Sequence, residues 1–171
     1  MLIYRPDDPY SDLARALCFI EDHAGDLNVN PYGYSLWGGS AGARMAAVCG
    51  NADYLRQLTG RNVLRWNESP VNSTHELPQA SAVIMQYTGY DTVSSAGAPT
   101  YACVGTYDGI ADYRGMQQRA NMLKRIGIPA ECHVYRGLSH GFGLGTGTVA
   151  EGWIRDAEAF WDQQSRSHFS F

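Results

Sequence analysis

The chain has 171 residues, of which 44% are hydrophobic and 18% charged, a composition that excludes disordered, collagen-like and membrane-spanning proteins. Its 13 basic and 17 acidic residues give a net charge of -4 and are scattered along the sequence, so neither nucleic acid nor a membrane surface is an expected partner. The four cysteines form no Cys-x-x-Cys pair and predict packed thiols rather than a zinc site. We expect a single domain over residues 1–171.

The N-terminus carries no apolar segment of signal-peptide length, and no stretch approaches the roughly 20 apolar residues of a membrane span. The chain as given is therefore expected in the cytoplasm. If the gene continues upstream of Met1, a signal peptide could precede this sequence and the protein would be secreted.

The first half of the chain predicts a helix, a strand, a sharp turn and a second helix. A helix beginning near Ser11 is expected to bury one apolar stripe, formed by Leu13, Leu17, Ile20, Ala24 and Leu27. Residues 34–37 form a short apolar strand that ends in two glycines, and residues 41–48 are small, strong helix formers. Residues 50–80 have weak periodicity and predict a surface excursion or lid-like segment with one short helix, over 52–58.

The second half alternates strands with helices. Residues 82–87 and 100–105 are apolar runs typical of strands buried on both faces, and residues 131–135 predict a further strand. Helices are expected between Ile110 and Gly127, with a stripe of Tyr113, Met116, Ala120 and Leu123, and at the end of the chain, burying Trp153, Ala157, Phe160 and Trp161. This alternation predicts an α/β fold, a mostly parallel sheet with helices on both faces.

The pattern Gly-x-Ser-x-Gly occurs at residues 38–42 and again at residues 137–141. A nucleophile elbow needs a strand before the serine and a helix after it, because the sharp turn exposes the hydroxyl and directs helix N–H groups at a developing oxyanion. Ser40 has both elements, whereas Ser139 precedes a glycine-rich run that cannot begin a helix. Ser40 is the candidate nucleophile.

The turn at Ser40 contains three glycines, Gly38, Gly39 and Gly42. Side chains at Gly38 and Gly42 are expected to collide where the backbone reverses between strand and helix.

A serine needs a base, and the base needs a group that orients it. Of the five histidines, only His140 lies in a loop just beyond a predicted buried strand, where parallel sheets place their ligands. Asp108 follows the strand ending at Gly105, and the order Ser40, Asp108, His140 matches that of α/β-hydrolases. Asp91 is the alternative acid. We favour Asp108 because its turn is shorter and its strand directly precedes the one that leads to His140.

Three stretches carry a resemblance to a known family: WGGSAGARMA (37–46), residues 104–148, and AEGWIRDAEAFW (150–161). They resemble the C-terminal part of the esterase/lipase branch of the α/β-hydrolase superfamily, and within it bacterial acetyl-xylan-esterase-like carbohydrate esterases. The resemblance implies Ser40 as nucleophile, Asp108 as triad acid and His140 as general base. It also implies the backbone N–H of Ala41 as one oxyanion donor, and no cofactor.

The sequence departs from the family at its beginning. Family members have further strands and a His-Gly-Gly-Gly-type loop before the strand that Leu2–Arg5 resembles, and that loop gives the second oxyanion N–H. We therefore expect an N-terminally truncated, incomplete α/β-hydrolase fold with a vacant strand position beside residues 34–37, filled by residues 1–6 or by a second copy in a homodimer. A monomeric mass in solution, together with the absence of a strand at residues 1–6, would exclude both ways of filling this position. Loss of one oxyanion donor costs about 10²- to 10³-fold in rate.

The expected function is a serine carboxylesterase that acts on small acyl esters, with acetylated carbohydrates as the expected class. One alternative is a peptidase domain of the prolyl-oligopeptidase type, which uses the same triad order. Another is a catalytically silent hydrolase-like module that binds a ligand or assembles with a partner, since the second oxyanion donor is absent. Labelling of Ser40 by a fluorophosphonate separates an enzyme from a silent module.

Overall fold

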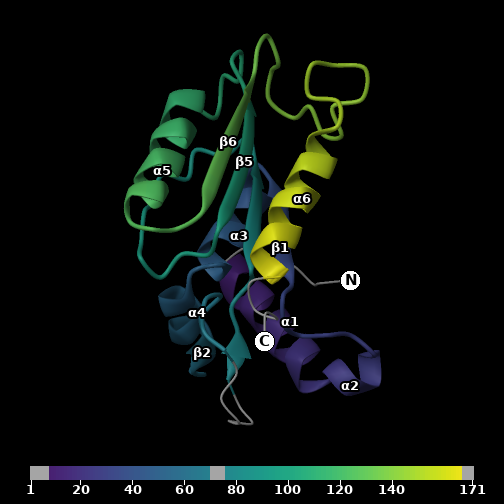
Figure 1. The fold of residues 1–171 in the computed structure, drawn as a ribbon, viewed down its shortest axis with the longest axis vertical. Coiled ribbons are helices and arrows are strands. Elements are labelled where there is room, and N and C mark those ends of the chain that lie inside the picture. Colours follow the sequence, from purple (N-terminus) through teal and green to yellow (C-terminus); the bar gives the residue numbers. More distant parts are fainter. Residues whose placement is uncertain (1–7, 70–75, 167–171) are drawn as a thin grey trace.

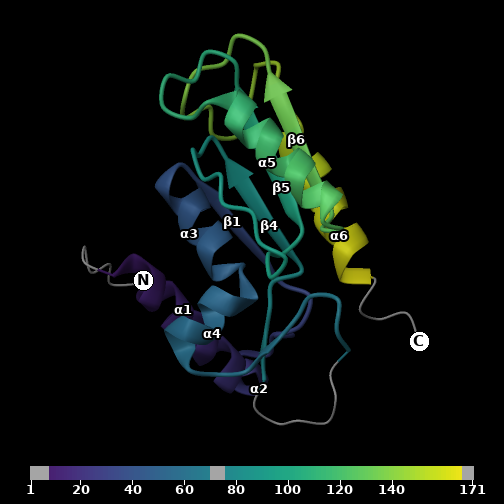
Figure 2. The ribbon, with the colours of Figure 1, turned by 90° about the vertical axis from the view of Figure 1, so that its left-hand side faces the viewer.

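A computed structural model describes residues 8–69 and 76–166 of the chain. Within these ranges a sheet of four parallel strands lies between layers of helices (Figures 1 and 2). The strands are β1 (Ser35–Gly39), β4 (Ala82–Gln86), β5 (Thr100–Gly105) and β6 (Ala130–Tyr135), in the spatial order β1-β4-β5-β6. All three neighbouring pairs are parallel, so the C-terminal ends of the strands meet at one edge. The predicted fold class is confirmed.

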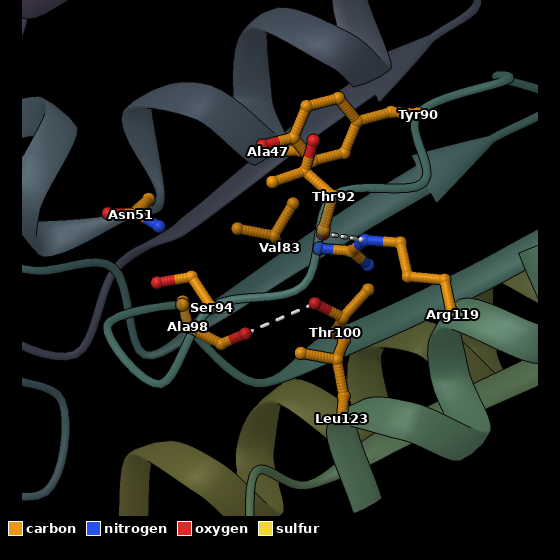
Figure 3. A pocket seen from close by; sticks show the side chains of 11 residues that line it. Ala47, Asn51, Val83, Tyr90, Thr92, Ser94, Ala98, Thr100, Arg119 and Leu123 are labelled. Atoms are coloured by element: carbon orange, nitrogen blue, oxygen red, sulfur yellow. Dashed lines mark hydrogen bonds between the residues drawn. The ribbon is translucent and has the colours of Figure 1, made fainter. Parts of the chain in front are cut away.

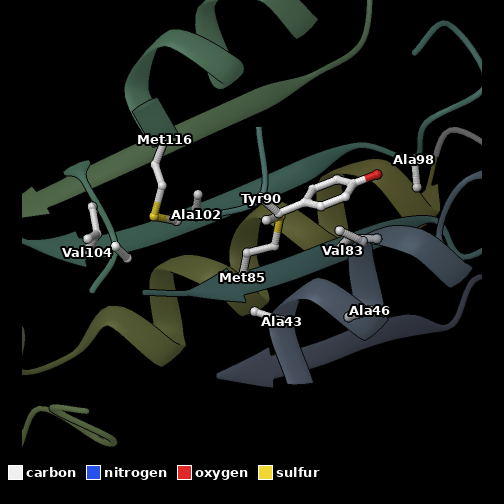
Figure 4. Packing of buried hydrophobic residues seen from close by; sticks show 11 residues of the cluster. Ala43, Ala46, Val83, Met85, Tyr90, Ala98, Ala102, Val104 and Met116 are labelled. Atoms are coloured by element: carbon white, nitrogen blue, oxygen red, sulfur yellow. The ribbon is translucent and has the colours of Figure 1, made fainter. Parts of the chain in front are cut away.

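Helices cover both faces of this sheet (Figure 2). On one face, α3 (Ala41–Cys49) packs over Val83 and Met85 of β4, while α5 (Tyr113–Arg125) packs over β5 and β6 (Figure 4). On the other face, α6 (Trp153–Arg166) packs over Ala82 and Ile84. Alternate side chains of a strand point to opposite faces, and every residue of β4 and β5 is buried, as predicted for strands covered on both sides.

The first helix differs from its prediction at both ends. Helix α1 (Pro9–Asp22) begins two residues early because the Asp8 side chain accepts a hydrogen bond from the Ser11 N–H at 3.0 Å and proline suits the first helical position. It stops at Asp22, and a separate short helix, α2 (Ala24–Leu27), follows the non-helical junction at His23. The predicted continuous stripe is therefore wrong beyond Leu17. Ile20 is 43% exposed and Leu27 is 47% exposed.

The segment 50–80 contributes to the core more than predicted. It contains the expected helix, α4 (Ala52–Thr59), and a parallel pair of short strands, β2 (Val63–Leu64) and β3 (Leu77–Pro78). Leu55, Val63 and Leu77 are buried in one cluster with residues of α1. The description of the whole segment as a surface excursion is thus corrected. Residues 70–75 lie outside the described ranges, and a lid-like role stays a prediction.

The outer side of β1 is the region where a vacant strand position was expected. Within the described ranges β1 pairs with β4 along one side. A cavity of about 380 Å³ lies beside it, with apolar walls that include Leu13 and Leu17 of α1 and Leu36 of β1. The predicted strand over residues 2–5, and its pairing through residues 1–6, lie outside the described residues. That pairing and the homodimer stay predictions.

Two further sequence expectations concern the cysteines and membrane spans. All four cysteines are free thiols, and Cys49 and Cys103 are buried in the core as predicted for packed thiols. Burial raises the pKa of Cys49 to about 12 and that of Cys132 to about 11, so both thiols stay protonated at neutral pH. Among the described residues, none of the helices is both long and apolar enough to cross a membrane.

Candidate active site

Ser40 occupies a strained turn between β1 and α3. Its backbone dihedrals are φ 54° and ψ -119°, a conformation that costs a non-glycine residue on the order of 1–3 kcal/mol. The Ser40 N–H donates to the Gln86 carbonyl at the end of β4 at 2.9 Å, which ties the turn to the neighbouring strand. The strand, turn and helix that the sequence predicted around Ser40 are all present.

The glycines of this turn differ in their steric roles. A Cβ at Gly38 would overlap the carbonyl group of Gly42 and lie 2.5 Å from the Ala43 nitrogen. A Cβ at Gly39 would lie 3.0 Å from the Tyr87 hydroxyl. A Cβ at Gly42 meets nothing within 4 Å. The predicted collision is confirmed for Gly38 and wrong for Gly42, because a side chain in that first turn of α3 would point into open space.

Ser40, His140 and Asp108 form a continuous chain of hydrogen bonds. The Ser40 Oγ lies 3.0 Å from His140 Nε2. His140 Nδ1 lies 2.9 Å and 3.0 Å from the two carboxylate oxygens of Asp108. With its proton on Nδ1, the imidazole donates to Asp108 and can accept the hydroxyl proton of Ser40 at Nε2. The His140 side chain is 22% exposed, whereas that of Asp108 is fully covered.

The local environment of Asp108 favours its ionised form. Its Oδ1 accepts hydrogen bonds from the N–H groups of Ile110 at 2.9 Å and Ala111 at 2.8 Å. Burial raises the pKa of Asp108, but the hydrogen bonds from Ala111, Ile110 and His140 outweigh it and hold the pKa below its ordinary value. At neutral pH the carboxylate is therefore charged and positioned to stabilise a protonated His140.

The alternative acid, Asp91, is exposed and lies in the loop between β4 and β5. Its neighbours Tyr90 and Thr92 cover a small space between α3 and α5 (Figure 3). There the Arg119 Nε donates to the Thr92 carbonyl at 3.0 Å, and the guanidinium carbon lies 5.3 Å from the centre of the Tyr90 ring. Burial lowers the pKa of Arg119 to about 10, so it stays charged at neutral pH. Asp91 thus belongs to a loop held over α5, and the carboxylate that reaches His140 is that of Asp108.

The other sequence candidates either take no part in this chain of hydrogen bonds or lie outside the described residues. No helix begins after Ser139, as predicted for the second Gly-x-Ser-x-Gly pattern. His23 stacks on Phe19 at the end of α1, and His133 on β6 contacts Glu131 at 2.9 Å. His75 and His168 lie outside the described residues.

Two positions near the triad escaped the sequence reasoning. A Cβ at Gly105, the last residue of β5, would overlap the Leu138 carbonyl and lie 2.8 Å from the Leu138 Cβ. This close approach joins the loops of Asp108 and His140, since the Tyr107 N–H also donates to the Leu138 carbonyl at 2.9 Å. Tyr87 is the second such position, with its ring centre 4.8 Å from that of His140. The position of Gly105 at the end of a predicted buried strand could have indicated a close backbone approach there. No local sequence feature distinguished Tyr87.

Ala41 is the first residue of α3, and its N–H belongs to the first helical turn, where N–H groups have no acceptor within the helix. An anion placed beside Ser40 would also experience the positive end of the helix dipole. These features suit Ala41 to the oxyanion role that the resemblance implies.

Comparison with known proteins finds solved structures only; no family model and no curated protein matches the chain. An acetyl ester-xyloside bifunctional hydrolase from Caldicellulosiruptor lactoaceticus matches 94% of this chain with a TM-score of 0.72 and 19% identity, over 67% of its own length. A truncated carbohydrate esterase from gut microbiota matches 92% with a TM-score of 0.69 and 13% identity, over 68% of its length. Esterase 2 of Thermogutta terrifontis matches 91% with a TM-score of 0.62 and 21% identity, over 63% of its length.

The described part of the chain therefore has the α/β-hydrolase fold of these esterases, as the sequence resemblance predicted. The chain spans about two thirds of the length of the structures it matches.

Proposed function

We propose that this chain is a serine carboxylesterase that hydrolyses small acyl esters, above all acetyl esters of carbohydrates. The observation that carries the proposal is the hydrogen-bonded series Ser40, His140, Asp108 at the strained turn after β1. Nucleophile and base lie within hydrogen-bond distance, and a buried carboxylate orients the base, which is the arrangement required for nucleophilic catalysis by serine.

In the proposed reaction the Ser40 Oγ attacks the ester carbonyl carbon while His140 Nε2 takes the hydroxyl proton. The tetrahedral oxyanion accepts a hydrogen bond from the Ala41 N–H. Collapse of this intermediate expels the alcohol, which takes the proton from His140 and leaves the acyl group on Ser40. Water then attacks the acyl carbon and gives a proton to His140. The second tetrahedral intermediate breaks its bond to the Ser40 Oγ, which takes that proton back from His140, and the carboxylic acid departs. Asp108 holds the imidazole in the required tautomer and stabilises its protonated form.

Two structural neighbours support the proposed substrate class. One is an acetyl ester-xyloside hydrolase and another is a carbohydrate esterase. The choice of acetylated carbohydrates rests on these neighbours, whereas the proposed ester hydrolysis rests on the triad, which requires only water as co-reactant.

The test is hydrolysis of 4-nitrophenyl acetate by the 171-residue chain, beside Ser40→Ala and the matched control Ser139→Ala. We expect Ser40→Ala to lower turnover at least about 10²-fold, because the nucleophile is lost, and Ser139→Ala to leave it unchanged. A fluorophosphonate should add its phosphonyl group, with loss of fluoride, to the wild-type chain and to Ser139→Ala, but not to Ser40→Ala. Equal hydrolysis by all three chains, without labelling, would refute the proposal and leave a silent hydrolase-like module.

A further inference from the structure

Tyr87, the residue directly after β4, has a strained backbone. Its φ of 34° is positive, a property shared among the described non-glycine residues by Asn28 and the candidate nucleophile Ser40. Asparagine adopts this region readily, but for a bulky residue such as tyrosine it is a genuine outlier. The Tyr87 N–H donates to the Cys103 carbonyl at 2.8 Å, so β5 holds the backbone in place. Strain of this kind persists where the surrounding structure fixes it, and it concentrates at functional sites.

The Tyr87 ring lies close to both the candidate base and the nucleophile turn. Its centre lies 4.8 Å from that of His140, at an interplanar angle of 64°. Its hydroxyl lies 3.0 Å from the position that a Cβ on Gly39 would occupy. Phe142 supports the ring edge-on, with 5.0 Å between centres, and itself packs against Tyr135 at 5.8 Å. Three aromatic rings therefore form a continuous support beside the imidazole.

Five glycines with positive φ lie within 10 residues either side of His140: Gly137, Gly141, Gly143, Gly145 and Gly147. The backbone of this loop is anchored, since the Gly143 carbonyl accepts hydrogen bonds from Gln86 Nε2 at 2.8 Å and from Trp153 Nε1 at 3.0 Å, but these bonds do not involve the imidazole. The hydrogen bonds to Asp108 act at the Nδ1 end of the imidazole. The Tyr87 ring adds a contact with the imidazole ring itself, and this contact restricts tilting that would disturb both the Asp108 bonds and the 3.0 Å distance from Nε2 to the Ser40 Oγ.

We propose that Tyr87 is a positioning residue whose ring fixes the plane of the His140 imidazole against Ser40. The ring carries this role and the hydroxyl does not, because packing against an imidazole requires only the aromatic edge and face. Phenylalanine should therefore replace tyrosine, whereas an aliphatic side chain of similar volume should not. The expected effect on kcat rests on the proposed function. The expected effect on the position of the His140 imidazole rests on the geometry alone.

The kinetic test compares Tyr87→Phe with Tyr87→Leu in 4-nitrophenyl acetate hydrolysis. We expect the phenylalanine variant to retain wild-type kcat within about threefold. The leucine variant should lose about 10- to 10²-fold in kcat with little change in KM, because misplacing a catalytic group by up to 1 Å costs a factor of this size. Phe160→Leu is the matched control. It makes the same aromatic-to-aliphatic change in the core under α6, and should lower the melting temperature without lowering kcat. Wild-type kcat in Tyr87→Leu would overturn the inference, as would an equal loss of kcat in Phe160→Leu.

A second measurement does not depend on esterase activity. The proton shared by His140 Nδ1 and Asp108 should give a downfield NMR signal in the wild-type chain and in Tyr87→Phe, and this signal should broaden or vanish in Tyr87→Leu. If the wild-type chain hydrolyses no ester but the signal follows this pattern, the positioning role stands and the proposed function fails. If the signal is identical in all three proteins, the positioning role is refuted whatever the activity.

Discussion

A pair of alanine substitutions within the nucleophile turn should have opposite effects. In Gly38→Ala the new Cβ would overlap the carbonyl group of Gly42 and lie 2.5 Å from the Ala43 nitrogen. Ordinary contacts begin near 3.4 Å, so the start of α3 would have to move by about 1 Å, and no rotamer change can relieve a collision between backbone atoms. Overpacking of this kind costs about 1–3 kcal/mol. A domain of this size loses about 2–4 °C in Tm per kcal/mol, which predicts a fall of about 2–12 °C.

Gly42→Ala is the control in the same turn. Its Cβ meets nothing within 4 Å, and the residue is helical, so alanine fits without strain. Because alanine restricts the unfolded chain more than glycine does, this variant should gain about 0.4–1 kcal/mol, or about 1–4 °C in Tm.

Thermal unfolding followed by circular dichroism measures both stability effects. Ester hydrolysis should fall about 10²-fold in Gly38→Ala alone, since that change displaces Ser40. If both variants lose stability to the same extent, our account of the turn is refuted.

Two further predictions concern the candidate triad acid, Asp108. Asp108→Asn should lower kcat by up to about 10⁴-fold while Asp91→Asn has no effect, and equal losses would disprove our choice of acid. Since folding lowers the Asp108 pKa below 3.8, its contribution to stability is present above that pH and lost as the pH falls through the lower folded value. As the pH is lowered from 5 to 2, the melting temperature should therefore fall less for Asp108→Asn than for the wild-type chain.

Much of the fold and of the site was predictable because the relevant signals are local. Unbroken apolar runs predicted β4 and β5 as strands covered on both faces, and both are wholly buried. A strand, two glycines and a run of small helix formers predicted the turn at Ser40. Loops that follow parallel strands meet at one edge of the sheet, so chain order alone brought Asp108 and His140 to the same region as Ser40.

Other features depended on contacts that periodicity does not encode. The stripe of the first helix continues past His23 in the sequence, but the helix ends at Asp22, and both Ile20 before the break and Leu27 after it are exposed. The segment 50–80 lacks a clear period, yet Leu55 and Leu77 are buried because α1 packs over them.

Local sequence patterns were enough to predict the four strands of the main sheet and the helices beside them, the three candidate triad residues and the edge of the sheet where these residues meet. The contacts that hold the three residues in place became visible only in the folded structure. Gly105 became important because the Leu138 carbonyl approaches it from the next loop, and Tyr87 because its ring reaches His140 across β5. Each of these contacts joins residues more than 30 positions apart, so their distance depends on how the strands and loops pack and not on any local preference of the chain.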